Sequence, residues 1–118
     1  MAQINIANVA TIKPVMQAMS LTTSITPILD VPTDSCMKID SIYLANKDGT
    51  NTAQASVIVS ANNGSSSFYL IHLVPIPPGA SVSVIDTPIY LDETDLLYGE
   101  ASANGDIDMV VSGVEMID

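Results

Sequence analysis

The chain has 118 residues, enough for one domain with a single core, and 13 Asp and Glu against three Lys give a formal net charge of −10. An acidic surface without Arg repels nucleic-acid phosphates and anionic membrane headgroups, so neither is expected as a partner. Only 14% of the residues are charged and 47% are hydrophobic, which favours a subunit whose surface is partly covered by neighbours.

The N-terminal third has the weakest strand signals. Ile4, Ile6 and Val9 could begin a strand. Residues 14–19 have a brief helical character, whereas residues 20–30 are rich in Thr, Ser and Ile and favour a strand. No basic region followed by an apolar core is present, so we expect no signal peptide and a protein made in the cytosol.

Residues 1–30 are therefore predicted to be an N-terminal arm or the first strands, belonging to the same fold as a β-sandwich domain over residues 31–118. An arm of this kind can dock on its own sheet or reach across to a neighbouring subunit, and both interpretations stay open.

Strand signals dominate from residue 37 onward. Residues 53–60 alternate apolar and polar side chains, as a strand with one buried face does. The apolar phase slips near Asp40 and Ser41, which predicts a β-bulge or a strand that crosses between sheets. Residues 46–51 contain an Asp-Gly pair and two Asn, which predicts a turn.

The middle of the chain contains a run that is apolar on both faces. A turn is expected at residues 62–65, followed by this apolar run at 68–74. Such a run is typical of a central strand covered on both sides, or of a strand with one face buried by another subunit. The proline-rich residues 75–79 predict a rigid corner that cannot pair within a sheet.

The last third alternates strands and turns. An acidic turn is expected at residues 92–95, a two-residue hairpin turn at 103–106, and a final alternating strand from Ile107. Six strand signals from residue 37 onward predict an all-β fold, an antiparallel β-sandwich that is jelly-roll-like and has an extended N-terminal arm.

Few side chains suit catalysis. His72, the single histidine, lies in an apolar strand and is interpreted as structural. Cys36, the single cysteine, cannot form an internal disulfide and is expected to be a partly buried, inert thiol. No phosphate-binding loop, paired-cysteine motif or nucleophile elbow occurs, so we expect no enzyme, no catalytic residues and no cofactor.

Two groups of residues have side chains that suit a binding site but also occur on ordinary protein surfaces. Asp92, Glu93 and Asp95 supply oxygen ligands of the kind Ca²⁺ prefers, but their spacing is not that of an EF-hand and acidic turns are common between strands. They remain weak metal candidates, and no metal is predicted. The four tyrosines could form a carbohydrate platform but are spread over separate strands: Tyr43, Tyr69, Tyr90 and Tyr98.

Residues 41–51, residues 82–91 and the ending at 98–112 resemble segments of small virion structural proteins of tailed bacteriophages. The joint order of these segments carries the resemblance, which extends over residues 37–117. It implies a β-sandwich subunit of the particle exterior, similar to capsid decoration (cement) proteins or to neck and tail accessory proteins. The family has no catalytic residues to carry over.

The resemblance and the composition together predict a capsid decoration protein that binds and stabilises the outer shell of a virion, and that is made in the host cytoplasm. The alternatives are a neck, tail or baseplate subunit, or a carbohydrate- or calcium-dependent module that binds a host surface. The expected partners are the major capsid protein or other virion proteins, together with further copies of the chain, with a trimer favoured. The predicted contact residues are Ile4, Ile6, Val9, Val15, Met16, Met19, Pro75, Ile76, Pro77 and Pro78.

Overall fold

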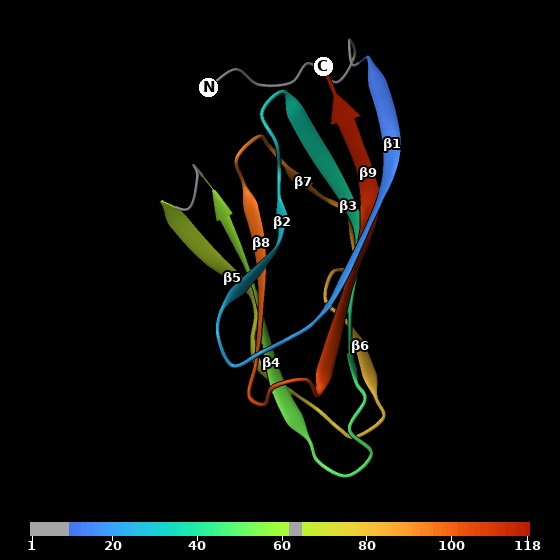
Figure 1. Ribbon diagram of the computed structural model, residues 1–118, viewed down its shortest axis with the longest axis vertical. Helices are drawn as coiled ribbons and strands as arrows, with labels where there is room; N and C mark the ends of the chain where they lie inside the picture. Colours follow the sequence, from blue (N-terminus) through green and yellow to red (C-terminus); the bar gives the residue numbers. More distant parts are fainter. Residues whose placement is uncertain (1–9, 62–64) are drawn as a thin grey trace.

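The computed structural model describes residues 10–61 and 65–118, and this part of the chain forms two antiparallel sheets packed face to face (Figure 1). Sheet A has the order β1-β9-β3-β6, with β7 also paired to β3, and sheet B has the order β2-β8-β4-β5. The strands of sheet A are β1 (Thr11–Ser20), β3 (Ser35–Asn46), β6 (Ser81–Ser83), β7 (Ile89–Leu91) and β9 (Ile107–Ile117). Those of sheet B are β2 (Thr26–Asp30), β4 (Ala53–Ala61), β5 (Ser66–Ile76) and β8 (Leu96–Ala101).

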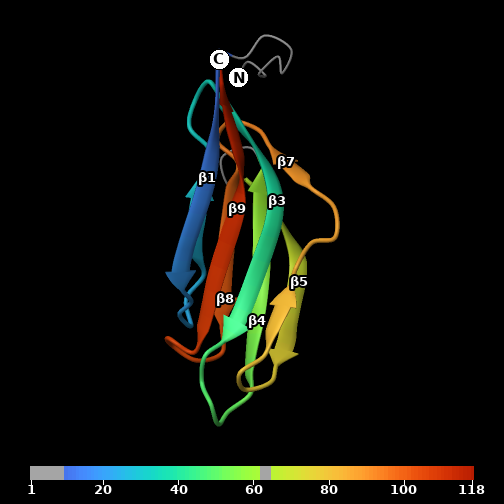
Figure 2. The same cartoon turned by 90° about the vertical axis from the view of Figure 1, so that its right-hand side faces the viewer.

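The predicted all-β sandwich is confirmed. Among the described residues, no helix has the length and apolar character needed to cross a membrane. Figure 2 looks onto sheet A, where β9 lies between β1 and β3.

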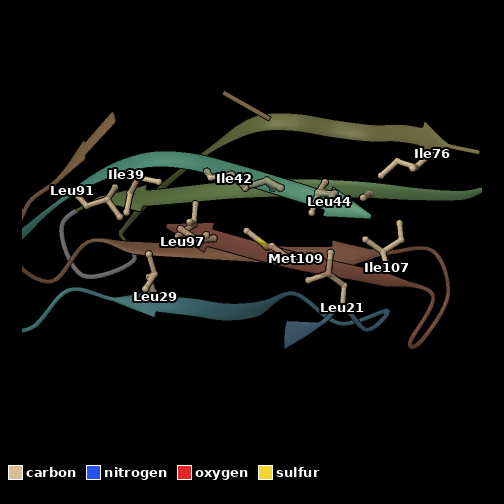
Figure 3. Packing of buried hydrophobic residues seen from close by; sticks show 14 of the residues in the cluster. Leu21, Leu29, Ile39, Ile42, Leu44, Ile76, Leu91, Leu97, Ile107 and Met109 are labelled. Atoms are coloured by element: carbon tan, nitrogen blue, oxygen red, sulfur yellow. The ribbon is translucent and has the colours of Figure 1, made fainter. Parts of the chain in front are cut away.

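The core lies between the sheets and is built by the alternation that the sequence shows. In β4, Ala53, Ala55 and Val57 point inward and are at most 2% exposed. Sheet A contributes the alternate residues of β3 and β9, and Leu21 closes one end after β1 (Figure 3). The largest fully buried side chains include Leu21, Ile39, Ile42, Leu44, Ile76, Leu97, Ile107 and Met109.

A β-bulge interrupts β3 where the apolar phase slips. The pairing of β3 with β9 shifts between Ile39 and Ser41, which confirms the predicted bulge. Gly113 of β9 faces this bulge, and a Cβ there would overlap the carbonyl oxygen of Lys38. A glycine is therefore required where the two backbones approach most closely.

Asn46 fastens the end of β3 to the end of β5. Its side chain is 2% exposed, and its Nδ2 donates to the carbonyl oxygens of Asn51 and Ile76, each at 2.9 Å. Its Oδ1 accepts the backbone N–H of Asp48 at 3.0 Å. This amide satisfies three backbone groups in the connection from sheet A to sheet B, and the predicted turn at residues 46–51 is confirmed.

The predicted two-residue hairpin at residues 103–106 is wrong. A turn does occur, with Gly105 at φ +80° and its N–H donating to the Leu21 carbonyl at 3.0 Å. It joins β8 of sheet B to β9 of sheet A, because the two strands belong to different layers and do not pair with each other. Turn residues alone do not distinguish a hairpin from a crossing between sheets.

Three further expectations differ from the structure. Residues 14–19 belong to β1 and have no helical turn, because pairing with β9 along ten residues overrides a weak local preference. Residues 68–74 lie in the edge strand β5, which pairs with β4 alone among the described strands, so the expected central strand is wrong, whereas burial of one face by another subunit stays a prediction. Pro75 pairs with Gln54 inside β5, since an edge strand tolerates a missing N–H, and the corner begins only after Ile76.

Candidate binding surfaces

One face of sheet A points away from the core and is almost free of charge at its centre. The register aligns alternate residues of β1, β9 and β3 across it, such as Met16 with Ser112 and Ser112 with Ser41. We call this surface the sheet A outer face: Ile12, Pro14, Met16, Ala18, Ser41, Tyr43, Tyr90, Val110, Ser112 and Val114.

Large apolar side chains on the sheet A outer face are open to solvent. Met16 is 66% exposed and Ile12 63%, both on the edge strand β1. Tyr90 is 59%, Tyr43 50% and Val110 36% exposed. An antiparallel sheet that faces water ordinarily carries polar or charged side chains on that side. This face therefore has the composition of an interface.

The charges on and beside the sheet A outer face are balanced, and Lys38 lies within the face, between Val114 and Tyr90. Lys38 pairs with Asp40 at 3.4 Å near one end, and Lys47 pairs with Asp108 at 2.9 Å near the other. The third Lys pairs with Glu115 at 3.5 Å, between β1 and β9. All three lysines of the chain are thus bound to carboxylates of sheet A, and the other ten of its 13 carboxylates have no Lys partner.

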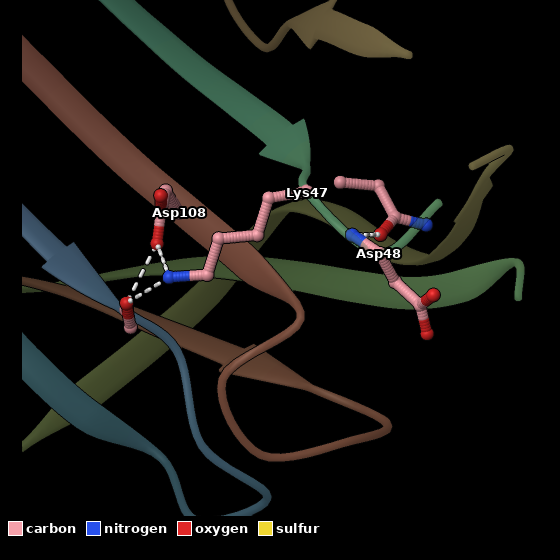
Figure 4. A network of polar contacts seen from close by, with 5 residues as sticks. Lys47, Asp48 and Asp108 are labelled. Atoms are coloured by element: carbon pink, nitrogen blue, oxygen red, sulfur yellow. Dashed lines mark hydrogen bonds and ion pairs between the residues drawn. The ribbon is translucent and has the colours of Figure 1, made fainter. Parts of the chain in front are cut away.

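A small polar network closes one end of the face (Figure 4). Ser20 Oγ donates to Asp108 Oδ1 at 2.6 Å, and Lys47 Nζ lies 3.0 Å from Ser20 Oγ and 2.9 Å from Asp108 Oδ1. The Ser20 hydroxyl, and next to it the Lys47 ammonium, lower the pKa of Asp108 below its ordinary value. The network ties β1 to β9 and to the residue that follows β3.

A second apolar surface follows β5, the edge strand of sheet B. Phe68 is 62%, Tyr69 53% and Leu73 48% exposed, and the ring of His72 lies 4.4 Å from that of Tyr69. Leu73 has φ +53°, and its N–H donates to the Ser56 hydroxyl at 2.9 Å. We call Phe68, Tyr69, His72 and Leu73 the β5 strip; it runs along the edge of sheet B and includes both faces of β5, because Phe68 and Tyr69 are consecutive residues paired with Val59 and Ile58. A branched side chain at positive φ is strained, and here it is held outward.

The contact residues predicted on β1 divide between its two sides. Met16 lies on the sheet A outer face, whereas Val15 and Met19 are half-buried and pack against the core. Met16 is therefore accessible to a partner, whereas Val15 and Met19 help to cover the core. Ile4, Ile6 and Val9 lie outside the described residues.

The contact residues predicted at the proline corner also divide. Pro75, Pro77 and Pro78 are exposed, but Ile76 is 1% exposed and belongs to the core. The three prolines therefore form a surface that Ile76 supports from within.

The carboxylates of the acidic turn accept backbone N–H groups, two within the turn and one from Asp34. Asp92 Oδ1 accepts the Glu93 N–H at 2.8 Å, and Asp95 Oδ2 accepts the Asp92 N–H at 2.9 Å. The buried Glu93 accepts the Asp34 N–H at 2.8 Å. Over residues 10–61 and 65–118, no three His, Cys, Asp or Glu side chains are grouped in a way that could hold a metal ion.

The remaining candidates have no catalytic arrangement among the described residues. Cys36 is 6% exposed, and burial, with the nearby Asp92 charge, raises the pKa of its thiol. His72 is exposed, and its printed ring contact is with Tyr69. The tyrosines fall on both sheets: Tyr43 and Tyr90 on sheet A, Tyr69 and Tyr98 on sheet B.

Sequence reasoning missed the sheet A outer face. Its signal lies in residues 11–20, where the even-numbered Ile12, Met16 and Ala18 alternate with the odd-numbered Val15 and Met19. Both sets are apolar, so neither is a polar side for water. A helical interpretation of residues 14–19 concealed this alternation.

The fold and these surfaces define a small antiparallel β-sandwich with two exposed apolar surfaces. No protein-family model matches the sequence, and no curated protein matches it either. The structure, however, is similar to solved structures whose sequences are very different.

Three such structures each match most of this chain. A capsid structure of the Helicobacter pylori bacteriophage KHP30 matches with a TM-score of 0.55 and 7% identity, over 93% of this chain and 90% of the other. A Bacillus endospore appendage, a disulfide-linked pilus, matches with a TM-score of 0.52 and 14% identity, over 91% and 87%. The Drosophila NLP core, described for pentamer formation and histone binding, matches with a TM-score of 0.50 and 14% identity, over 85% and 96%. At these identities the likeness shows a shared fold.

Proposed function

We propose that this protein is a structural subunit of a bacteriophage particle, and in particular a capsid decoration (cement) protein on the outside of the shell. The observation that carries the proposal is the pair of separate exposed apolar surfaces, one on each sheet, in a chain that is otherwise strongly acidic. A subunit that joins neighbours needs more than one surface of this kind.

The arrangement of the strands supports a virion role. When β6 and β7 are taken together as one partner of β3, each sheet has four strand positions, with orders β1-β9-β3-β6 and β2-β8-β4-β5. This order supports the jelly-roll interpretation, and jelly rolls recur in viral capsid proteins. The likeness to a phage capsid structure points the same way, and the likeness to a pilus protein supports a role in an assembly of subunits.

The chemistry of the side chains supports a role in binding rather than in catalysis. The single thiol is buried with a raised pKa, and the single imidazole contacts a tyrosine ring. Such a protein acts by mass action, because each copy that bridges two capsomers adds its binding free energy to the cost of opening the shell.

The test is binding to purified particles from which the protein has been removed. A Phe68→Glu variant should lose occupancy, because a charge placed in the β5 strip must be desolvated on contact. Ile25→Glu is the matched control, since Ile25 is 52% exposed but belongs to neither surface. Equal occupancy of the two variants would contradict a role for the β5 strip.

The N-terminal segment is tested separately, by deleting residues 2–9. A deletion that extends to Met19 would remove most of β1 and disturb the fold, because β1 pairs with β9 along its whole length. Copy number then separates decoration from the alternative of a neck or tail subunit. Hundreds of copies per particle would support decoration, and a dozen or fewer would support the neck or tail.

A further inference from the structure

We propose that the sheet A outer face binds the same face of a second copy of this chain. This goes beyond the proposed function, because it assigns one of the two apolar surfaces to self-association and leaves the β5 strip for other partners. The assignment rests on charge, on the state of the polar groups within the face, and on area.

Charge distinguishes this face from the rest of the molecule. Two chains of net charge −10 repel each other unless they meet where the charge is locally balanced. The sheet A outer face meets this condition, since Lys38, which lies between Val114 and Tyr90, is paired with Asp40, and the ion pair of Lys47 lies at one end.

The ten carboxylates without a Lys partner lie elsewhere. Two of them, Asp30 and Glu100, are on sheet B, and the other eight lie outside the strands. A basic partner would be drawn to those regions. A second copy of this acidic chain, in contrast, is best accommodated on the neutral face.

The two serine hydroxyls at the centre of the face bind each other. The hydroxyls of Ser41 and Ser112 are 2.8 Å apart and hydrogen-bond to each other across β3 and β9. Each oxygen therefore keeps a hydrogen-bond partner when the face is covered, which reduces the penalty for burying these polar groups. The surrounding Ala18, Val110 and Met16 give the face small or flexible side chains that can pack against an identical surface.

The area of the face is sufficient for a specific contact. The ten residues of β1 extend over about 33 Å, and four neighbouring strand positions cover about 19 Å. Face-to-face packing of two copies would thus bury roughly 1,200 Å² in total, the lower end of the range for stable interfaces.

The experiment is the molar mass of the purified full-length chain by light scattering at about 0.1 mM protein. We expect at least twice the 12.4 kDa of one chain. Met16→Glu should return the mass to that of one chain, with self-association weakened about 100-fold, since two copies would each bury a carboxylate. Val110→Glu tests the same face from β9, and the matched control Phe68→Glu should leave the mass unchanged.

Thermal melting of each variant keeps the comparison valid, because all three positions are exposed and the monomer fold should persist. If Met16→Glu does not fold, Val110→Glu decides. A single-chain mass for the wild type, or an assembly that survives both changes to sheet A, would overturn the proposal. Dissociation by Phe68→Glu alone would assign self-association to the β5 strip and would overturn it as well. Particles are not involved, so the outcome is independent of the proposed function.

Discussion

Replacing Asn46 should destabilise the protein more than any other single polar change described above. Asn46→Ala removes three hydrogen bonds and leaves the buried carbonyl oxygen of Ile76 without its side-chain donor. A net contribution of about 1 kcal/mol for each bond, with 1–3 kcal/mol for an unsatisfied buried group, gives a loss of roughly 4–6 kcal/mol. For a domain of this size that lowers the melting temperature by about 16–24 °C.

Urea unfolding followed by far-ultraviolet circular dichroism measures the loss, and tyrosine fluorescence gives a second probe because the chain has no Trp. Asn51→Ala is the matched control: its side chain donates to Asp48 Oδ2 at 3.2 Å on the surface, and its backbone carbonyl stays in place. We expect that control to change stability by no more than about 0.5 kcal/mol. A difference of less than about 1 kcal/mol between the two variants would refute the role given to Asn46.

Three further predictions follow from other parts of the fold. Gly113→Ala should destabilise by about 2–3 kcal/mol, because its Cβ overlaps the backbone of β3, whereas Gly49→Ala, with nothing within 4 Å, should change little in the same melting experiment. The lowered pKa of Asp108 implies stability that is present above the ordinary pKa of an aspartate, near 4, and is lost as the pH falls through the lowered pKa. Asp108→Asn should therefore cost stability at pH 7 and progressively less in acid, and an offset that does not vary with pH would exclude the ion pair with Lys47 as its source. Cys36 should react with a thiol reagent at neutral pH far more slowly than in urea-unfolded chain, since burial raises its pKa, and equal rates would contradict that burial.

Periodicity predicted the parts of the fold in which one side of a strand is polar. Residues 53–60 alternate clearly and form β4, and the slip of phase at Asp40 is the bulge of β3. Where both sides are apolar, as in residues 68–74, periodicity does not show the position of a strand in its sheet. That run forms the edge strand β5, which pairs with β4, and several of its apolar side chains are exposed in the single chain.

The candidate surfaces were harder to predict, because they depend on which strands become neighbours. Met16 and Tyr43 are 27 positions apart in the sequence, yet both lie on one face, as β9 pairs with both of their strands. Local pattern cannot supply that proximity. The burial of Cys36 was predicted correctly from its own strand. The sheet A outer face was missed because three strands assemble it.

The central place of β9 in sheet A also governs when the protein can fold. β9 pairs with both β1 and β3, although it is the last of the described strands to leave the ribosome. Until β9 emerges, β1 has no partner in sheet A, and neither has the edge of β3 that will pair with β9. The apolar side chains of these strands are then open to chaperones or to wrong pairing. Sheet A is therefore completed only after residues 107–117 have been synthesised, and a chain truncated before them would have to be degraded or held rather than assembled.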